Sequence, residues 1–144
     1  VAAFSYDRKV LLERHVLGRD LAISIIDEDG APRALPIVEA VPEQEDFYDF
    51  ESRYEIGRTD FVCPAELDPA VAERVHEIAL AAWSLLGCRG FARVDMILGA
   101  DGPMVLEVNP IPGLTETSLF PQAADAAGLG FDSVVSRVLA CALR

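Results

Sequence analysis

The chain has 144 residues, of which 51% are hydrophobic, so it is long enough for one compact core and short for two ordinary domains. Its formal net charge is −12, from 12 Lys and Arg against 24 Asp and Glu. This balance excludes a polyanionic partner, because nucleic-acid binders gain affinity by neutralising phosphates with Lys and Arg. We therefore expect any phosphate-bearing ligand to be bound locally, through a divalent cation.

The sequence shows neither a membrane span nor a secretory signal. No stretch approaches the roughly 18 uncharged apolar residues that cross a bilayer, so we expect a soluble, cytoplasmic chain. The first residue is Val1, which leaves open a fragment or a processed product. The three cysteines are odd in number and far apart, which is typical of reduced, buried thiols. They are Cys63, Cys88 and Cys141.

The first predicted elements are strands. Residues 9–16 alternate in polarity, and the Ile-rich run 21–27 leads to the Asp29-Gly30 turn. Residues 34–41 then return and complete a predicted hairpin. Residues 42–60 are polar and aromatic without a sustained period, and a loop of this length in a small domain is usually functional.

Helices and a second hairpin follow. Asp68-Pro69 is a cap and first-turn pair, and an apolar face recurs at helical spacing until Gly87, formed by Val71, Val75, Ile78, Ala82 and Leu85. Strands are predicted over 91–98 and 104–109, around a loop in which Gly102 takes the left-handed position. Two further helices are predicted, over 118–127 and from the cap Asp132 to Leu143. This mixture predicts one α+β domain over residues 1–144, with a mainly antiparallel sheet and packed helices.

The second hairpin carries the residues that suggest chemistry. A turn centred on Asp101 pairs Asp95 with Glu107 and Arg93 with Asn109, all four on one face. The alternate residues then enter a core on the other face: Val94, Met96, Leu106 and Val108.

The polar face predicts a cation site. Two opposite carboxylates about 5 Å apart repel each other unless a positive charge lies between them. The oxygens of Asp95, Glu107 and Asn109 suit Mg²⁺ or Mn²⁺, with phosphate oxygens and waters completing an octahedron. Arg93 can hold a phosphate or a developing oxyanion. A salt bridge from Arg93 to Asp95 or Glu107 on a solvated sheet face explains the same residues equally well.

Asn109 is followed by a stiff loop, Pro110-Ile111-Pro112-Gly113-Leu114-Thr115. Its backbone N–H groups can contribute to an anion or oxyanion site, although a plain turn explains the Pro-Gly pair equally well.

Two runs of sequence, GCRGFARVD at 87–95 and EVNPIPGLT at 107–115, strongly resemble the D-alanine:D-alanine ligases of the ATP-grasp superfamily. The resemblance continues through SLFP at 118–121 and AAGL at 126–129. Upstream it includes FYDFE at 47–51 and CPA at 63–65, so that nearly the whole chain is covered.

The resemblance implies a cytoplasmic ligase of peptidoglycan precursor synthesis that uses ATP and Mg²⁺ or Mn²⁺. ATP phosphorylates the carboxylate of a first D-alanine, the amine of a second attacks the acyl phosphate, and a tetrahedral intermediate expels phosphate. The chain resembles only the carboxy-terminal part of the catalytic module. The amino-terminal domain and the lysine-bearing central lid are absent, and Lys9 is the single lysine. We therefore expect the chain to be inactive alone. We also expect its parent enzyme to be a homodimer.

The family motif assigns roles to the hairpin residues. Asp95, Glu107 and Asn109 look like the ligands of two magnesium ions, with Glu107 placed to bridge them. Arg93 and the backbone N–H of Gly113 resemble the family's stabilisers of the tetrahedral oxyanion.

Further roles lie outside the hairpin. Ser118 and the backbone at Leu119 match positions that receive the carboxylate of the second amino acid. Glu13 and the backbone near Val16 resemble the groups that bind adenine. Asp20 aligns with a family glutamate that contacts the ribose, and because Asp20 is one methylene shorter, a ribose contact through a bridging water is the alternative to direct contact.

Some positions depart from the family pattern. Arg53 and Tyr54 fall where the family has a Lys-Tyr pair on a loop that closes over the active site, and Arg differs from Lys in geometry. Pro110 replaces a Thr-like residue, and Glu116 adds negative charge near the proposed acceptor carboxylate. Two alternatives therefore stay open: a related carboxylate–amine ligase with another acceptor, and a non-catalytic nucleotide-sensing or interaction module.

Overall fold

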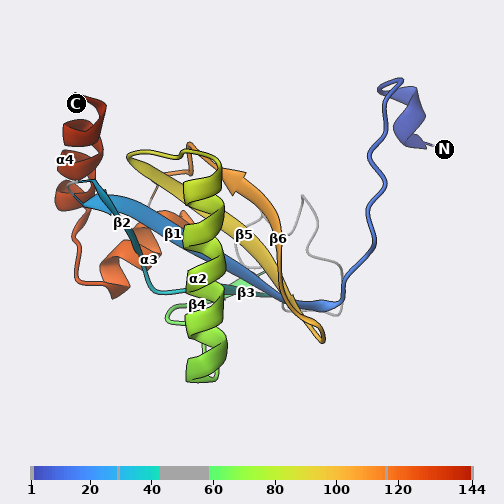
Figure 1. The fold of residues 1–144 in the computed structure, drawn as a ribbon, viewed down its shortest axis with the longest axis horizontal. Helices are drawn as coiled ribbons and strands as arrows, with labels where there is room; N and C mark the ends of the chain where they lie inside the picture. The colour runs from blue at the N-terminus through green and yellow to red at the C-terminus, as the bar shows by residue number, and fades with distance from the viewer. Residues whose placement is uncertain (1, 29, 43–58, 116, 144) are drawn as a thin grey trace.

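The computed structural model describes residues 2–28, 30–42, 59–115 and 117–143, in which one antiparallel sheet carries helices on both faces (Figure 1). The strand order is β4-β3-β1-β5-β6, with β2 also paired to β1. The strands are β1 (Gly18–Glu28), β2 (Ala31–Ala34), β3 (Val38–Pro42), β4 (Thr59–Val62), β5 (Phe91–Gly99) and β6 (Gly102–Asn109). The helices are η1 (Ala2–Ser5, 3-10), α2 (Pro69–Leu85), α3 (Leu119–Ala126) and α4 (Phe131–Ala142). The predicted α+β class is confirmed.

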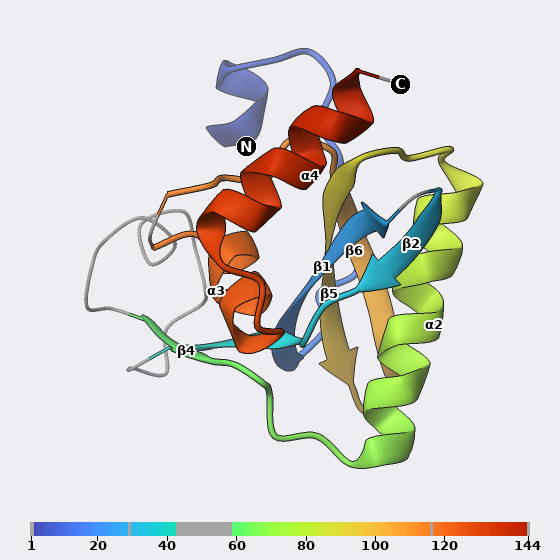
Figure 2. The same ribbon diagram turned by 90° about the vertical axis from the view of Figure 1, so that its left-hand side faces the viewer.

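Two apolar cores lie on opposite faces of the sheet. Helix α2 covers one face, and α3 and α4 cover the other (Figure 2). The core under α2 contains Val75, Ala79 and Trp83 with the strand residues Leu21, Ile23, Ile25, Ala92, Val94 and Met96. The core under α3 and α4 contains Phe120, Ala123, Ala124 and Val134 with Ala22, Ile26, Leu35 and Val38. Because successive strand residues point to opposite faces, Arg93 and Asp95 belong to the face of α3 and α4.

Helix α2 forms where the capping signals predict it. The Asp68 carboxylate accepts a hydrogen bond from the Ala70 backbone N–H at 2.9 Å, and Pro69 is the first helical residue. The helix ends before Gly87, which has φ +63°. Leu85, predicted on the apolar face, is 85% exposed, whereas Trp83 is 4% exposed. The core-facing stripe is therefore rotated relative to the predicted one at the end of the helix.

The first hairpin forms around Gly30, which has φ +91°, and its returning segment is divided into two strands. Strand β2 pairs with the end of β1, and β3 pairs with the beginning of β1. Pro36 lies between them and has no N–H to donate to a ladder. The continuous strand predicted over 34–41 is therefore interrupted at the proline.

Residues 9–16, predicted as a strand, have no regular structure and extend away from the sheet (Figure 1). Leu11 is 80% exposed and Leu12 is 94% exposed. A strand needs a neighbouring backbone for its N–H and C=O groups, and no described strand borders this segment. The strand prediction for 9–16 is therefore wrong for this chain.

The two carboxy-terminal helices agree with the prediction except at one cap. Ser118 is the N-cap of α3, so the helix begins where the predicted segment begins. The N-cap of α4 is Gly130, and Asp132 lies in the first turn instead of capping the helix. No helix in the described ranges is both long enough and apolar enough to cross a membrane.

Candidate active site

The β5–β6 hairpin places the four predicted polar residues together. Asp95 pairs with Glu107 and Arg93 pairs with Asn109, as predicted. Near the turn, however, Gly99 pairs with Gly102, so the loop has two residues and the register there differs by one from the predicted register.

A β-bulge reconciles the two registers. Met96 pairs with Val105 while Asp95 pairs with Glu107, so Leu106 is the extra residue on β6. Leu106 is 51% exposed, and the prediction that it enters the core is wrong. The bulge therefore turns the Glu107 side chain onto the face that carries Asp95.

Arg93 and Asp95 form a two-bonded ion pair on this face. Arg93 Nε donates to Asp95 Oδ1 at 2.6 Å, and Nη2 donates to Oδ2 at 2.8 Å. The side chains are 13% and 11% exposed, so the pair lies largely out of solvent. The alternative of a salt bridge is thus confirmed for Arg93 and Asp95, but the solvated setting that it assumed is wrong.

The donor set of the hairpin suits a hard divalent cation. Glu107 is exposed and lies opposite Asp95, and Asn109 Oδ1 accepts the Ile111 backbone N–H at 3.0 Å. Among the described residues, no group of three or more His, Cys, Asp or Glu is placed to hold a metal. The hairpin by itself supplies only two carboxylates and one amide oxygen, a set that fits Mg²⁺ when ligand oxygens and water complete the shell.

The loop after β6 brings Gly113 against Ser118. A Cβ atom added to Gly113 would lie 2.7 Å from Ser118 Oγ, so only glycine allows this approach without a shift. The Ser118 hydroxyl is also 2.8 Å from Thr115 Oγ1 and accepts the Thr115 backbone N–H at 3.2 Å. Two residues with separate predicted roles, Gly113 and Ser118, are therefore in direct contact.

Ser118 and Leu119 stand at the beginning of α3. Ser118 has an extended backbone, and its side chain makes no capping hydrogen bond to the helix. The first backbone N–H groups of a helix lack intrahelical partners and carry the positive end of its dipole. This geometry is suited to a carboxylate ligand.

The predicted nucleotide-binding residues are less closely grouped. Asp20 on β1 pairs with Ile97, which lies two residues beyond Asp95 on β5, so Asp20 is on the same sheet face as Asp95. Glu13 is exposed in the extended segment before β1, and Val16 is half-buried. The structure thus brings Asp20 towards the hairpin site but does not bring Glu13 to it.

Two predicted residues lie outside the described part of the chain. Arg53 and Tyr54 fall in the range 43–58, as does the FYDFE run. Glu116 is likewise outside the described residues.

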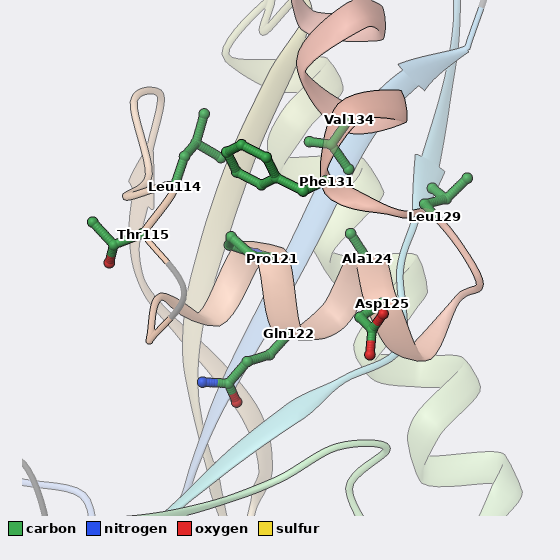
Figure 3. A pocket seen from close by; sticks show the side chains of 9 residues that line it. All are labelled: Leu114, Thr115, Pro121, Gln122, Ala124, Asp125, Leu129, Phe131 and Val134. Atoms are coloured by element: carbon green, nitrogen blue, oxygen red, sulfur yellow. The ribbon is translucent and has the colours of Figure 1, made fainter.

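A hollow of about 520 Å³ lies beside the loop that carries Thr115. Figure 3 shows that its lining side chains come from this loop, from α3, from the segment between α3 and α4, and from the beginning of α4. The apolar part of the lining is Leu114, Pro121, Ala124, Leu129, Phe131 and Val134, and the polar part is Thr115, Gln122 and Asp125.

Two further features were not predicted from the sequence. Thr115 contacts the Ser118 hydroxyl, and its spacing of three residues from Ser118 was the available signal. Arg19 donates two hydrogen bonds to Glu39, at 2.6 and 2.5 Å, and one to the Glu66 carbonyl at 2.9 Å. The hydrogen bonds to Glu39 raise the pKa of Arg19. Nothing local in the sequence indicates this second pairing, which joins β1, β3 and the segment before α2.

The antiparallel sheet, with paired carboxylates, an arginine and a helix N-terminus on one face, has the fold of the carboxy-terminal part of ATP-grasp ligases. The family model described as D-ala D-ala ligase C-terminus matches residues 1–140. The chain therefore belongs to the D-alanine:D-alanine ligase family.

Individual relatives agree with this family. The chain is 38% identical over 142 residues to the D-alanine--D-alanine ligase of Desulforamulus reducens, covering 99% of this chain and 45% of the relative. It is 44% identical over 135 residues to the D-alanine--D-alanine ligase of Methylacidiphilum infernorum, covering 93% of this chain and 43% of the relative. The crystal structure of the Bacillus anthracis ligase complexed with ATP superposes with a TM-score of 0.81 at 33% identity, covering 99% and 45%. The chain thus spans less than half the length of these relatives.

Proposed function

We propose that this chain is the carboxy-terminal part of an enzyme that joins two D-alanines with ATP. The observation that carries the proposal is the register of β5 and β6, which sets Asp95 opposite Glu107 and Arg93 opposite Asn109 on one face. This arrangement gathers two carboxylates, an amide and a guanidinium, and packing of an apolar core requires none of these groups. The relatives' names and the ATP complex of the Bacillus anthracis ligase support the same activity.

In the proposed reaction, the γ-phosphoryl group of ATP moves to the carboxylate of the first D-alanine. The amine of the second D-alanine then attacks the acyl carbon, loses a proton, and the intermediate expels phosphate. Asp95, Glu107 and Asn109 are the proposed ligands of Mg²⁺ or Mn²⁺, which supplies charge neutralisation of the phosphates when bound. We assign Arg93 and the Gly113 backbone N–H to the oxyanion.

The proposed acceptor site is formed by Gly113, Ser118 and the first residue of α3. Ser118 Oγ and the Leu119 backbone N–H are the donors assigned to the acceptor carboxylate. Asp20 is assigned to the ribose and Glu13 and Val16 to the adenine. Arg53 and Tyr54 are assigned to the closing loop.

The chain alone is proposed to be inactive, since Lys9 is its single lysine and the family holds the ATP phosphates with lysines of the lid. The remainder of the enzyme is proposed to supply an amino-terminal domain and a lysine-bearing lid. We further propose that the complete enzyme is a cytoplasmic homodimer that serves peptidoglycan precursor synthesis.

The test measures dipeptide and phosphate formation by the full-length protein that contains this chain, with ATP, Mg²⁺ and D-alanine. Asp95→Asn with Glu107→Gln is expected to lower the rate by about a hundredfold or more, because the metal contributes several kcal/mol. The matched control is Asp101→Asn with Glu77→Gln, which removes two charges at positions whose side chains are 89% and 57% exposed.

Wild-type protein that forms no D-alanyl-D-alanine contradicts the proposal. D-serine and D-lactate as second substrates decide between the D-alanine ligase and a ligase with another acceptor. If the Asp95/Glu107 variant and the control lose equal fractions of the dipeptide-forming rate, the proposed metal site is contradicted. The proposed ligase activity is not contradicted by that result.

A further inference from the structure

Ser118 is held by one neighbour, Thr115, through three contacts. The Thr115 backbone N–H donates to Ser118 Oγ at 3.2 Å, and the two hydroxyl oxygens lie 2.8 Å apart. In return, the Ser118 backbone N–H donates to the Thr115 carbonyl at 2.9 Å. These contacts hold Ser118 immediately before α3, so the position of the Ser118 hydroxyl depends on Thr115.

The contacts restrict where the Ser118 hydroxyl can send its proton. A serine hydroxyl has one hydrogen and two acceptor positions, and the Thr115 backbone N–H fills one of these positions. When Thr115 Oγ1 donates across the 2.8 Å contact, the second position is filled as well. The Ser118 proton then has to point away from Thr115, towards a ligand.

Either hydroxyl can donate across this contact, so the bound ligand decides the direction. Thr117 Oγ1 is 3.5 Å from Thr115 Oγ1, so the contact with Ser118 is the shorter and stronger of the two that Thr115 makes. Ser118 also makes no side-chain capping bond to α3, which leaves its hydroxyl available to a ligand. A carboxylate only accepts hydrogen bonds, so it selects the arrangement in which Ser118 donates.

We propose that Thr115 is a positioning residue that makes Ser118 a hydrogen-bond donor for the carboxylate of the acceptor amino acid. The inference rests on the proposed function. It also explains why the loop needs glycine at 113, because the Ser118 hydroxyl that Thr115 holds lies over that residue, 2.7 Å from where a Cβ would stand. The acceptor carboxylate is thereby placed beside the turn whose N–H is assigned to the oxyanion.

The test uses the full-length protein and compares Thr115→Val, Thr115→Ser, Ser118→Ala and the double variant Thr115→Val with Ser118→Ala. Thr115→Val keeps the backbone N–H and removes the hydroxyl. We expect it to raise the KM of the second D-alanine about three- to tenfold, the effect of one modest hydrogen bond, and to leave the KM of ATP and of the first D-alanine within about twofold. Thr115→Ser is expected to restore the wild-type value to within about twofold.

The double variant tests whether Thr115 acts through Ser118. We expect it to match Ser118→Ala alone, because two residues of one network give non-additive effects. An unchanged KM for the second D-alanine in Thr115→Val, equal changes for both amino acids, or additive effects in the double variant overturn the inference. Wild-type protein without dipeptide formation overturns the proposed function, and the inference with it.

Discussion

Arg93 and Asp95, two residues apart on β5, are joined by hydrogen bonds of 2.6 and 2.8 Å that use both oxygens of the carboxylate. The same carboxylate lies opposite Glu107 and is a proposed metal ligand. A cation that binds Asp95 therefore has to share the carboxylate with Arg93 or replace it. The ion pair and the metal site are two uses of one group, and this relationship can be tested by metal affinity.

Arg93→Met removes the guanidinium and leaves Asp95 opposite Glu107. We expect the full-length variant to bind Mn²⁺ at least about tenfold more tightly than the wild type does. The competing guanidinium is gone, and the two carboxylates that remain repel each other unless a cation binds between them. Electron paramagnetic resonance of Mn²⁺ measures this affinity without turnover. Arg137→Met is the control, because Arg137 pairs with Glu28 through a 2.7 Å bond on α4 and β1. Equal Mn²⁺ affinity in the Arg93 variant and the wild type contradicts competition for Asp95.

Ser24 on β1 is 0% exposed, and its hydroxyl has no hydrogen-bond partner among the residues that the structure describes. We expect Ser24→Ala to raise the free energy of unfolding by about 1 kcal/mol, because an unsatisfied buried hydroxyl is removed. The matched change is Ala22→Ser, at a residue that lies two positions away on the same face and is 6% exposed. This change is expected to lower the free energy of unfolding by about 1 kcal/mol or more. Urea unfolding measures both, and a loss of stability in Ser24→Ala shows that this hydroxyl is satisfied in solution.

Arg19 forms a fork with Glu39, whose side chain is 11% exposed. Arg19→Met leaves this carboxylate without its partner, and we expect a loss of about 2 kcal/mol, below the full value for buried pairs because Arg19 is partly exposed. Arg74→Met, in an exposed pair with Glu77, is the control and is expected to cost under about 0.5 kcal/mol. The measurement is chemical unfolding at neutral pH, and similar losses in both variants argue against a special role for Arg19.

The Arg19–Glu39 pair also makes the stability of the fold depend on pH. The hydrogen bonds to Glu39 raise the pKa of Arg19 above its ordinary value. A cation with a raised folded-state pKa stabilises fully below the unfolded-state pKa and loses that contribution as pH rises through the folded-state pKa. The Arg19 contribution is therefore constant through neutral pH and disappears only under strongly alkaline conditions.

Cys63 is partly buried, and this burial raises the pKa of its thiol. The unfolded chain then releases the thiol proton at lower pH than the folded chain, so this contribution to stability is complete below about pH 8.5 and declines above it. We expect Cys63→Ala to show a shallower loss of unfolding free energy on the alkaline side than the wild type. Unfolding curves from neutral to alkaline pH measure the difference, and parallel profiles contradict the assignment.

The sequence alone determined the parts of this protein that depend on local signals. The Asp68-Pro69 pair and Gly87 define the limits of α2, because caps and left-handed residues act within one helical turn. Alternation along the hairpin predicted that Asp95 and Glu107 share a face, because strand side chains alternate with period two. The family resemblance rests on the same short motifs and agrees with the match over residues 1–140.

Only the tertiary structure decided the features that depend on partners distant in sequence or on a break in periodicity. The bulge at Leu106 changes the register without any local mark, and the strand expected over 9–16 is absent because strand formation requires a neighbouring backbone. The Arg19–Glu39 pair arises because β1 and β3 lie side by side. Local hydrogen bonding and periodicity can be read along the chain, whereas register, pairing and burial depend on which segments become neighbours.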